Sequence, residues 1–135
     1  MNWTAFLALP AALLLAGCSP NSTRVELVNT TGYPIEVQLF YDDDQELPEV
    51  LIEEDGEEVN ITVSAGETAS FQRDCDDLQA IFINDADLRV LPGLSPEEDT
   101  EVFREPDDFG CGDTLVFTFT TNALATDLDI DFRSE

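Results

Sequence analysis

Hydrophobic and polar residues alternate with a period of two along most of the chain after residue 24, which is typical of half-buried β-strands. The clearest example spans residues 33–41, where every second side chain is apolar: Tyr33, Ile35, Val37, Leu39 and Tyr41. Residues 78–83 are apolar on both faces, which predicts a central strand. Seven to nine short strands without a helical period predict an all-β fold, a single small β-sandwich, with a small β-barrel as the alternative.

The other predicted strands lie at residues 24–27, 50–52, 59–63, 69–72, 88–91, 115–120 and 128–132, and residues 102–103 are a candidate edge strand. Asp55-Gly56 separates two of these apolar runs and predicts the tip of a two-residue hairpin. This register places Ile52 opposite Val59 and Val50 opposite Ile61, so that apolar residues share one face. The segment Asp85-Ala86-Asp87 predicts a turn between two strands.

An apolar run at residues 5–16 precedes the alternating region. It suits the core of a signal peptide and is too short for a membrane-spanning helix, which needs roughly 20 residues. The run continues into Leu15-Ala16-Gly17-Cys18, which resembles the lipobox of bacterial lipoproteins. The resemblance implies a signal peptide at residues 1–17 and a lipidated cysteine with a short tether at residues 18–23. The alternating pattern then places an acidic β-sandwich domain at residues 24–135. A plain secretory signal and a buried apolar helix are the alternatives.

Lipidation of Cys18 implies attachment to a lipid bilayer, because two or more acyl chains give stable anchoring. The resemblance therefore implies a cell-envelope protein that faces the periplasm or the cell surface. Ser19, rather than Asp, follows Cys18, which in a Gram-negative bacterium favours the outer membrane. The tether reaches at most about 17 Å. We therefore expect the most acidic loops to point away from anionic headgroups, which repel them within a Debye length of about 8 Å.

The charge of the chain is strongly negative, with 30 acidic residues, five arginines, no Lys and no His, and a formal net charge of −25. Such a surface repels phosphate backbones, so nucleic acid is excluded as a partner. It also excludes a polybasic patch for anionic lipids. The charge is explained by solubility, by adaptation to salt, or by loose binding of divalent cations.

Two cysteines remain after Cys18, namely Cys75 and Cys111. In an oxidising compartment we expect them to form a disulfide that acts as a structural staple. Two free thiols or a metal site are the alternatives, although a zinc site with two thiols and no His would need carboxylate ligands. The absence of a Cys-x-x-Cys motif argues against a redox role.

Calcium is the most specific ligand that the sequence suggests, because carboxylate oxygens are abundant. The hairpin register faces Glu53 with Glu58, and such like charges are either solvated in salt or bridged by a cation. Weak candidates for a calcium site are Asp42, Asp44, Glu53, Glu58, Asp76 and Asp77. The alternating acids at residues 127–131 resemble the start of an EF-hand loop, but Phe132 stands where Gly is required, so we interpret them as one solvated strand face.

No catalytic residue is predicted, because a chain without His, Lys or a free cysteine lacks the usual pairs of nucleophile and base. We therefore predict that the protein is not an enzyme and needs no cofactor. The leading prediction is a membrane-anchored envelope lipoprotein whose β-domain binds another envelope protein or stabilises an assembly. A calcium- or carbohydrate-binding surface module is the alternative, and a small hydrolase is a third.

Overall fold

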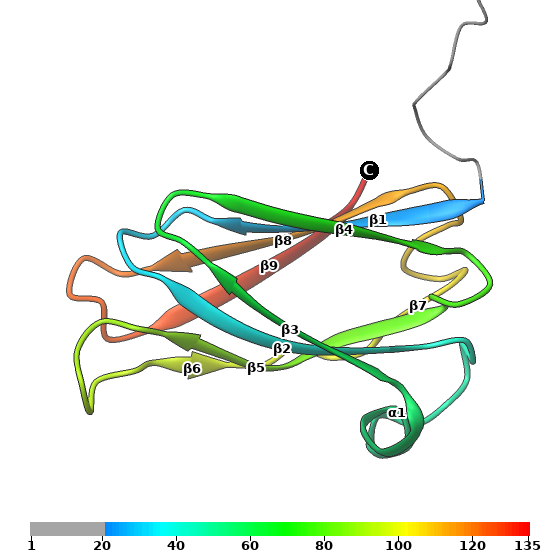
Figure 1. The fold of residues 1–135 in the computed structure, drawn as a ribbon, viewed down its shortest axis with the longest axis horizontal. Coiled ribbons are helices and arrows are strands. Elements are labelled where there is room, and N and C mark those ends of the chain that lie inside the picture. Colours follow the sequence, from blue (N-terminus) through cyan, green and yellow to red (C-terminus); the bar gives the residue numbers. More distant parts are fainter. Residues whose placement is uncertain (1–20) are drawn as a thin grey trace, which may run out of the picture.

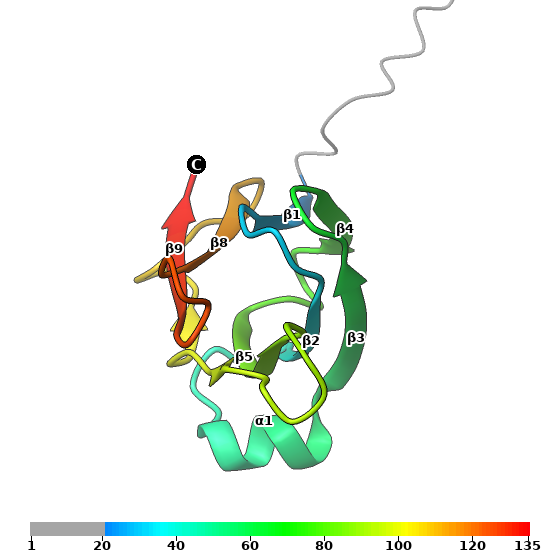
Figure 2. The same cartoon turned by 90° about the vertical axis from the view of Figure 1, so that its left-hand side faces the viewer.

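The computed structural model describes residues 21–135, which form two β-sheets packed face to face (Figures 1 and 2). Sheet A has the order β4–β1–β8–β9, with the bounds Thr68–Asp74, Ser22–Asn29, Thr114–Thr121 and Leu128–Ser134. Sheet B has the order β3–β2–β5–β6, with the bounds Glu57–Val63, Ile35–Asp42, Ala80–Leu88 and Glu97–Glu98, and β7 (Phe103–Arg104) also pairs with β5. The predicted β-sandwich is confirmed, and the barrel alternative is wrong, because the nine strands of these residues lie in two open sheets.

Strand β1 starts the domain earlier than the sequence predicted. It begins at Ser22 rather than residue 24, and Thr23 is fully buried. The strand pairs antiparallel with β4 and parallel with β8, so it lies inside sheet A. A tether from Cys18 therefore ends at residue 21. Cys18 itself and the predicted signal peptide at residues 1–17 lie outside the described residues.

The main core lies between the two sheets and follows from the alternation of the sequence. Every second residue of β1 and β2 is buried there, and β5 and β8 contribute their inward faces. The fully buried side chains of this core include Val25, Leu27, Ile35, Leu39, Ile81, Ile83, Leu115, Phe117 and Phe119. Burial of each such side chain contributes roughly 1.5–3 kcal/mol.

Residues 49–55 are helical, so the prediction of a strand and hairpin at this point is wrong. Helix α1 (Glu49–Asp55) follows Pro48 and buries Ile52, while Val50 and Leu51 stay exposed. Strand β3 pairs instead with β2, which places Val59 opposite Leu39. The physical reason is local, because a short run of apolar residues fits a helix as well as a strand. Here a helix of seven residues, about two turns, buries Ile52 alone.

Helix α1 covers a second, smaller core on the outer face of sheet B. Phe40, Ile52, Ala80 and Phe82 are buried together there, and the rings of Phe40 and Phe82 lie 5.7 Å apart. Since β5 packs on the main core with one face and under α1 with the other, its apolar character on both faces is explained. The prediction of a central strand at this point is confirmed.

Strand β5 runs without interruption from Ala80 to Leu88, so the predicted turn at Asp85-Ala86-Asp87 is wrong. An irregularity in its pairing with β2 occurs near Gln38, where the register shifts by one residue. The sequence alternates through this stretch, with Ala86 and Leu88 buried and Asp87 on the other face. The acidic pair therefore lies within a strand because alternate burial outweighs the turn preference of Asp.

The connections between strands gather at two ends of the sandwich (Figure 1). Residue 21 enters at one end, where the segments 43–56, 75–79 and 105–113 also lie; we call this the entry end. The segments 30–34, 64–67, 89–96 and 122–127 lie at the opposite end, which we call the far end. Within residues 21–135, no helix has the length and apolar character needed to cross a membrane.

Candidate functional site

The Cys75–Cys111 disulfide is present, as predicted, and it lies at the entry end. The two Cα atoms are 5.4 Å apart, and the bond joins the end of β4 to the segment that precedes β8. The backbone N–H of Cys75 donates to the carbonyl oxygen of Asn21 at 2.7 Å. The disulfide therefore holds together the end of the sandwich at which the chain from Cys18 enters.

Charge is distributed unequally between the two ends. The entry-end segments hold thirteen acidic residues and no basic one: seven acids in residues 43–56, two in 75–79 and four in 105–113. The far-end segments hold only Glu67, Asp127 and Arg89. The most acidic loops thus lie at the end where the chain enters at residue 21, because the strands that precede these loops all run toward that end. The expectation that they point away from anionic headgroups stays a prediction.

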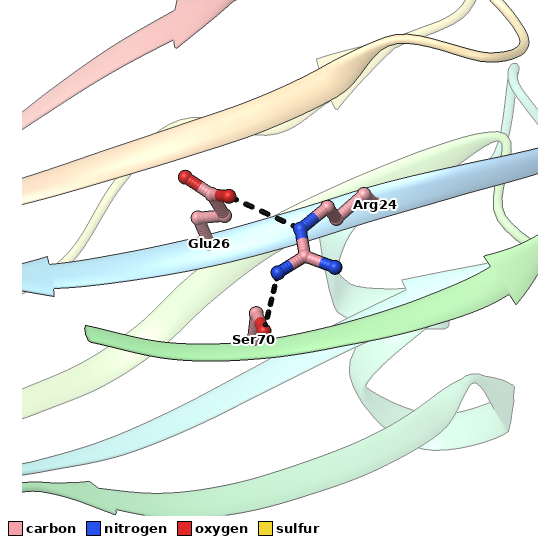
Figure 3. Close-up of polar contacts among 3 residues, drawn as sticks. All are labelled: Arg24, Glu26 and Ser70. Carbon is pink, nitrogen blue, oxygen red and sulfur yellow. Dashed lines mark hydrogen bonds and ion pairs between the residues drawn. The ribbon is translucent and has the colours of Figure 1, made fainter. Parts of the chain in front are cut away.

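All five arginines have partners within the domain. Arg24 shows the pattern: its Nε lies 3.1 Å from an oxygen of Glu26, and its Nη2 donates to Ser70 Oγ at 2.9 Å across the β1–β4 pair (Figure 3). The others bond in the same way to carboxylate, hydroxyl or carbonyl oxygens: Arg73, Arg89, Arg104 and Arg133. The guanidinium groups thus support the fold rather than form a basic surface.

Asp42 and Asp77, two of the predicted calcium candidates, line one hollow of about 310 Å³ at the entry end, together with Asp43, Asp55 and Glu57. Burial, together with the charges of Asp43 and its neighbour Asp44, raises the pKa of Asp42 above its ordinary value. The hollow thus concentrates negative charge, although Asp42 alone of these five side chains is partly buried and the other four are exposed.

The other calcium candidates have different surroundings. Asp44 accepts a hydrogen bond from the N–H of Glu46 at 2.9 Å and so stabilises its own loop. Glu53 lies on α1, Glu58 on β3, and Asp76 is exposed beyond β4. The structure therefore does not bring the six candidates together into one site.

Within residues 21–135, three carboxylates come close enough to share one ion: Asp85, Asp87 and Glu97, whose nearest oxygens lie within 4.8 Å of one another. Asp85 and Asp87 stand two residues apart on one face of β5, and Glu97 of β6 pairs directly with Asp87. We call these three residues the carboxylate triad. The Asp87 side chain is 16% exposed, and its Oδ1 atom is buried without a hydrogen-bond partner.

Two members of the triad, Asp85 and Glu97, bind a proton more tightly than they would in water. Burial, followed by the charge of Asp87, raises the pKa of Asp85 above 3.8. A hydrogen bond with Asp87, together with its charge, raises the pKa of Glu97 above 4.5. Arg89 offsets this only in part, because its Nη2 lies 3.7 Å from Asp87 and also bonds to Glu36. The triad is therefore a place where a proton or a hard cation relieves repulsion.

An amide network lies beside the triad on the outer face of sheet B. Asn84 donates to Gln38 at 2.9 Å, and Gln38 donates in turn to Glu58 at 2.6 Å. Asn60 donates to the same Glu58 oxygen at 3.1 Å, and these bonds lower the pKa of Glu58. The network connects β5, β2 and β3 and fixes the side chains next to a shallow hollow of about 310 Å³.

Sequence reasoning missed the triad because it treated Asp85 and Asp87 as a turn. The alternation of polar and apolar residues continues through this segment and would have indicated a strand. Asp85, Asp87 and Arg89 fall on one face, opposite the buried Ala86 and Leu88. The same alternation could not have identified Glu97 as the third member of the triad. Its strand has only two residues, both acidic, and such a short segment has no periodicity.

Neither a family model nor a curated protein matches this sequence. Three solved structures resemble the fold. One is a protein from Eubacterium rectale, with 14% identity, a TM-score of 0.47, and coverage of 86% of this chain and 92% of that one. Another is the T6SS lipoprotein TssJ1 from Pseudomonas aeruginosa, with 13% identity, a TM-score of 0.43, and coverage of 84% and 97%. The third is the cytotoxin suilysin from Streptococcus suis, with 10% identity, a TM-score of 0.46, and coverage of 84% and 23%. At these values the resemblances carry no argument about function.

Proposed function

We propose that the protein is a lipid-anchored, non-enzymatic module of the cell envelope that binds another envelope protein or stabilises an assembly. The observation that supports this most directly is the position of Cys18. It ends an apolar run through Leu15-Ala16-Gly17 and stands four residues before Ser22, where β1 begins. A lipid on this thiol would hold a folded domain close to a bilayer.

Two further features of the chain support the proposal. The Cys75–Cys111 disulfide fits an oxidising compartment outside the cytoplasm. The chain has no His and no Lys, and Cys75 and Cys111 are bonded to each other, so the described domain holds no familiar pair of nucleophile and base. This absence supports the proposal of binding rather than catalysis.

Metabolic labelling with a fatty acid tests the anchor. Label should enter the wild type and a Ser19→Ala variant, which is the matched control, and should be absent from Cys18→Ser. Mass spectrometry of the native protein should find a modified Cys18 as the first residue. A native chain that begins at Met1 with an unmodified Cys18 thiol would overturn the proposal.

The membrane to which the anchor directs the protein has its own test. Ser19 after the lipidated cysteine favours the outer membrane in a Gram-negative host, with the domain facing the periplasm or the cell surface. Density fractionation should place the wild type with the outer membrane and move a Ser19→Asp variant to the inner membrane. Identical distributions would contradict this part of the proposal.

Calcium binding at the carboxylate triad is a second candidate function. The observation that favours it is Asp87 Oδ1, a buried carboxylate oxygen without a hydrogen-bond partner. Oxygen ligands are those that Ca²⁺ prefers, and a cation here would also relieve the repulsion between Asp87 and Glu97. Its test is a calcium-specific rise in melting temperature that depends on Asp87.

A further inference from the structure

The far end of the sandwich presents apolar side chains to solvent. Six large apolar residues are exposed among residues 21–135, and four of them lie in far-end loops: Tyr33, Leu91, Leu94 and Leu124. Leu124 is 78% exposed and Leu91 is 63% exposed. Exposure of such side chains at one place on a small domain is typical of an interaction surface.

The loops that present these residues are fixed to one another. The N–H of Arg89 donates to the carbonyl oxygen of Pro34 at 2.9 Å, which joins the loop after β5 to the loop after β1. Buried Asn29 donates through Nδ2 to the carbonyl oxygens of Tyr33 and Val63 at 2.7 and 3.1 Å. Figure 2 views the molecule from this end and shows these loops at the ends of the strands of both sheets.

The loop after β8 is closed by its own hydrogen bonds. Asn122 accepts from the N–H of Thr126 at 2.9 Å and donates to its hydroxyl at 2.8 Å. Ala125 is buried with φ of 51°, so Leu124 is directed outward beside a buried neighbour. Leu91 and Leu94 exchange backbone hydrogen bonds around Gly93, whose φ is 83°. These apolar side chains therefore stand on ordered turns, which lowers the entropy that binding would cost.

A hollow of about 570 Å³ lies at this end, between Glu36 and the segment from Arg89 to Ser95. Its wall includes the apolar Val90 and Pro92. One inserted aromatic or aliphatic side chain would fill part of such a hollow, and interface energy is concentrated at anchors of this kind.

Charge distinguishes the far end from the rest of the surface. Its segments contain Glu67, Asp127 and Arg89, whereas the entry end holds thirteen acids. The carboxylate triad lies on β5 and β6 just below the far-end loops and forms an acidic rim. A partner with an apolar segment beside basic residues would therefore contact the apolar far-end loops and be attracted by the carboxylates of the triad.

We propose that the far end docks a protein that presents an apolar segment flanked by Lys or Arg residues. The apolar core of that segment would cover Leu91, Leu94 and Leu124, and its basic flanks would face the triad. The net charge of −25 would speed association with a basic partner. This inference rests on the proposed function for its orientation, because an anchor at the entry end turns the far end toward the surroundings.

The alternatives of a bilayer and a second copy are less well supported by the same observations. A domain of charge −25 is repelled by anionic headgroups and by its own copies. Two copies joined at their far ends would also direct their tethers in opposite directions, away from a common membrane. Both remain as outcomes that the experiment distinguishes.

Site-specific photocrosslinking in the native host tests the proposal with the full chain. A benzophenone amino acid replaces Leu91, Leu124 or, as the matched control, Val50, which is 61% exposed on α1 at the entry end. We expect Leu91 and Leu124 to capture the same protein, with the crosslink in an apolar segment flanked by Lys or Arg, and Val50 not to capture it. The identified protein should then bind L91S/L124S at least tenfold more weakly than V50S.

Several results would overturn the proposal: no protein crosslink at either far-end position, crosslinks to lipid or to a second copy, equal capture at Val50, or an acidic captured segment. Melting curves of the variants exclude unfolding as the cause of lost capture.

The Cys18→Ser variant separates the test of docking from the test of the lipid anchor. Capture that survives in Cys18→Ser supports docking whatever the labelling experiment shows, and a wild type that captures its partner but takes up no label counts only against the anchor.

Discussion

The backbone N–H of Cys75 donates to the carbonyl oxygen of Asn21 at 2.7 Å, at the point where the described chain begins. Thr23, two residues further on, places its Oγ1 atom 3.7 Å from the sulfur of the same cysteine. The Cys75–Cys111 disulfide thus supports the first residues of β1, the strand that a lipid anchor would pull. A central strand with a covalent staple beside it resists such a load better than an edge strand would.

The first prediction concerns this staple. C75S/C111S should lower the free energy of unfolding by about 4 kcal/mol, because the disulfide closes a loop with a sequence separation of 36. Urea unfolding of the oxidised wild type and of the double variant measures the difference. Reduced wild type is the control and should match the double variant. Equal midpoints for oxidised and reduced wild type would show that the disulfide contributes nothing to stability.

The second prediction concerns Asp87 and pH. In the folded protein Asp87 raises the pKa of both Asp85 and Glu97, so the native state binds protons more tightly than the unfolded chain does. Stability therefore falls as pH rises from the ordinary values of 3.8 and 4.5 through the raised ones. The melting temperature of the wild type should therefore rise as the pH falls through the raised pKa values toward 4.5, and that of Asp87→Asn should rise less.

A matched variant separates this local effect from general repulsion among carboxylates. Asp129→Asn removes one charge from an exposed position on β9 of sheet A, whereas all three triad residues lie in sheet B. It should keep the rise that the wild type shows. Were the two variants to respond alike, the pH dependence would come from the overall charge and not from Asp87.

Much of the fold could be predicted from the sequence, since the alternation that defines β1, β2 and β8 reports burial on one face. The helix could not. Val50, Leu51 and Ile52 are consecutive apolar residues, which fit a strand as well as a helix. Gly56 was interpreted as a hairpin residue, whereas a side chain there would meet the carbonyl oxygen of Ile52 at 2.5 Å. Close approach of the backbone requires this glycine, and sequence alone does not distinguish the two reasons.

The candidate sites depended on contacts between segments distant in sequence. The disulfide was predicted because only two cysteines remained, so no geometry was needed. The triad joins Asp87 to Glu97 through a two-residue strand, and the far-end surface joins loops around Tyr33, Leu91 and Leu124. Local patterns do not predict which loops share an end, because this depends on the direction in which each preceding strand runs.

The third prediction concerns an aromatic contact between β9 of sheet A and β7 of sheet B. Phe132 of β9 stacks on Phe103 of β7 with 3.8 Å between ring centroids, and so connects sheet A to sheet B. Phe132→Ala should lower the free energy of unfolding by about 2–3 kcal/mol, because it removes a half-buried ring and its stacking. Asp131→Ala, at the exposed neighbouring position, should change it by about 0.5 kcal/mol or less. Equal urea midpoints for Phe132→Ala and the wild type would contradict this role.

The last prediction concerns calcium and uses salt as its control. The repulsion that a net charge of −25 creates is screened by any salt, so sodium chloride alone should raise the melting temperature. Calcium at matched ionic strength should raise it further if the triad binds the ion, and a concentration 100 times the Kd corresponds to about 2.7 kcal/mol. The extra rise should be absent in Asp87→Asn and present in Asp129→Asn. Equal rises in both salts would reject the calcium site. An extra rise that survives Asp87→Asn would instead place the ion elsewhere, for example at the hollow lined by Asp42 and Asp77.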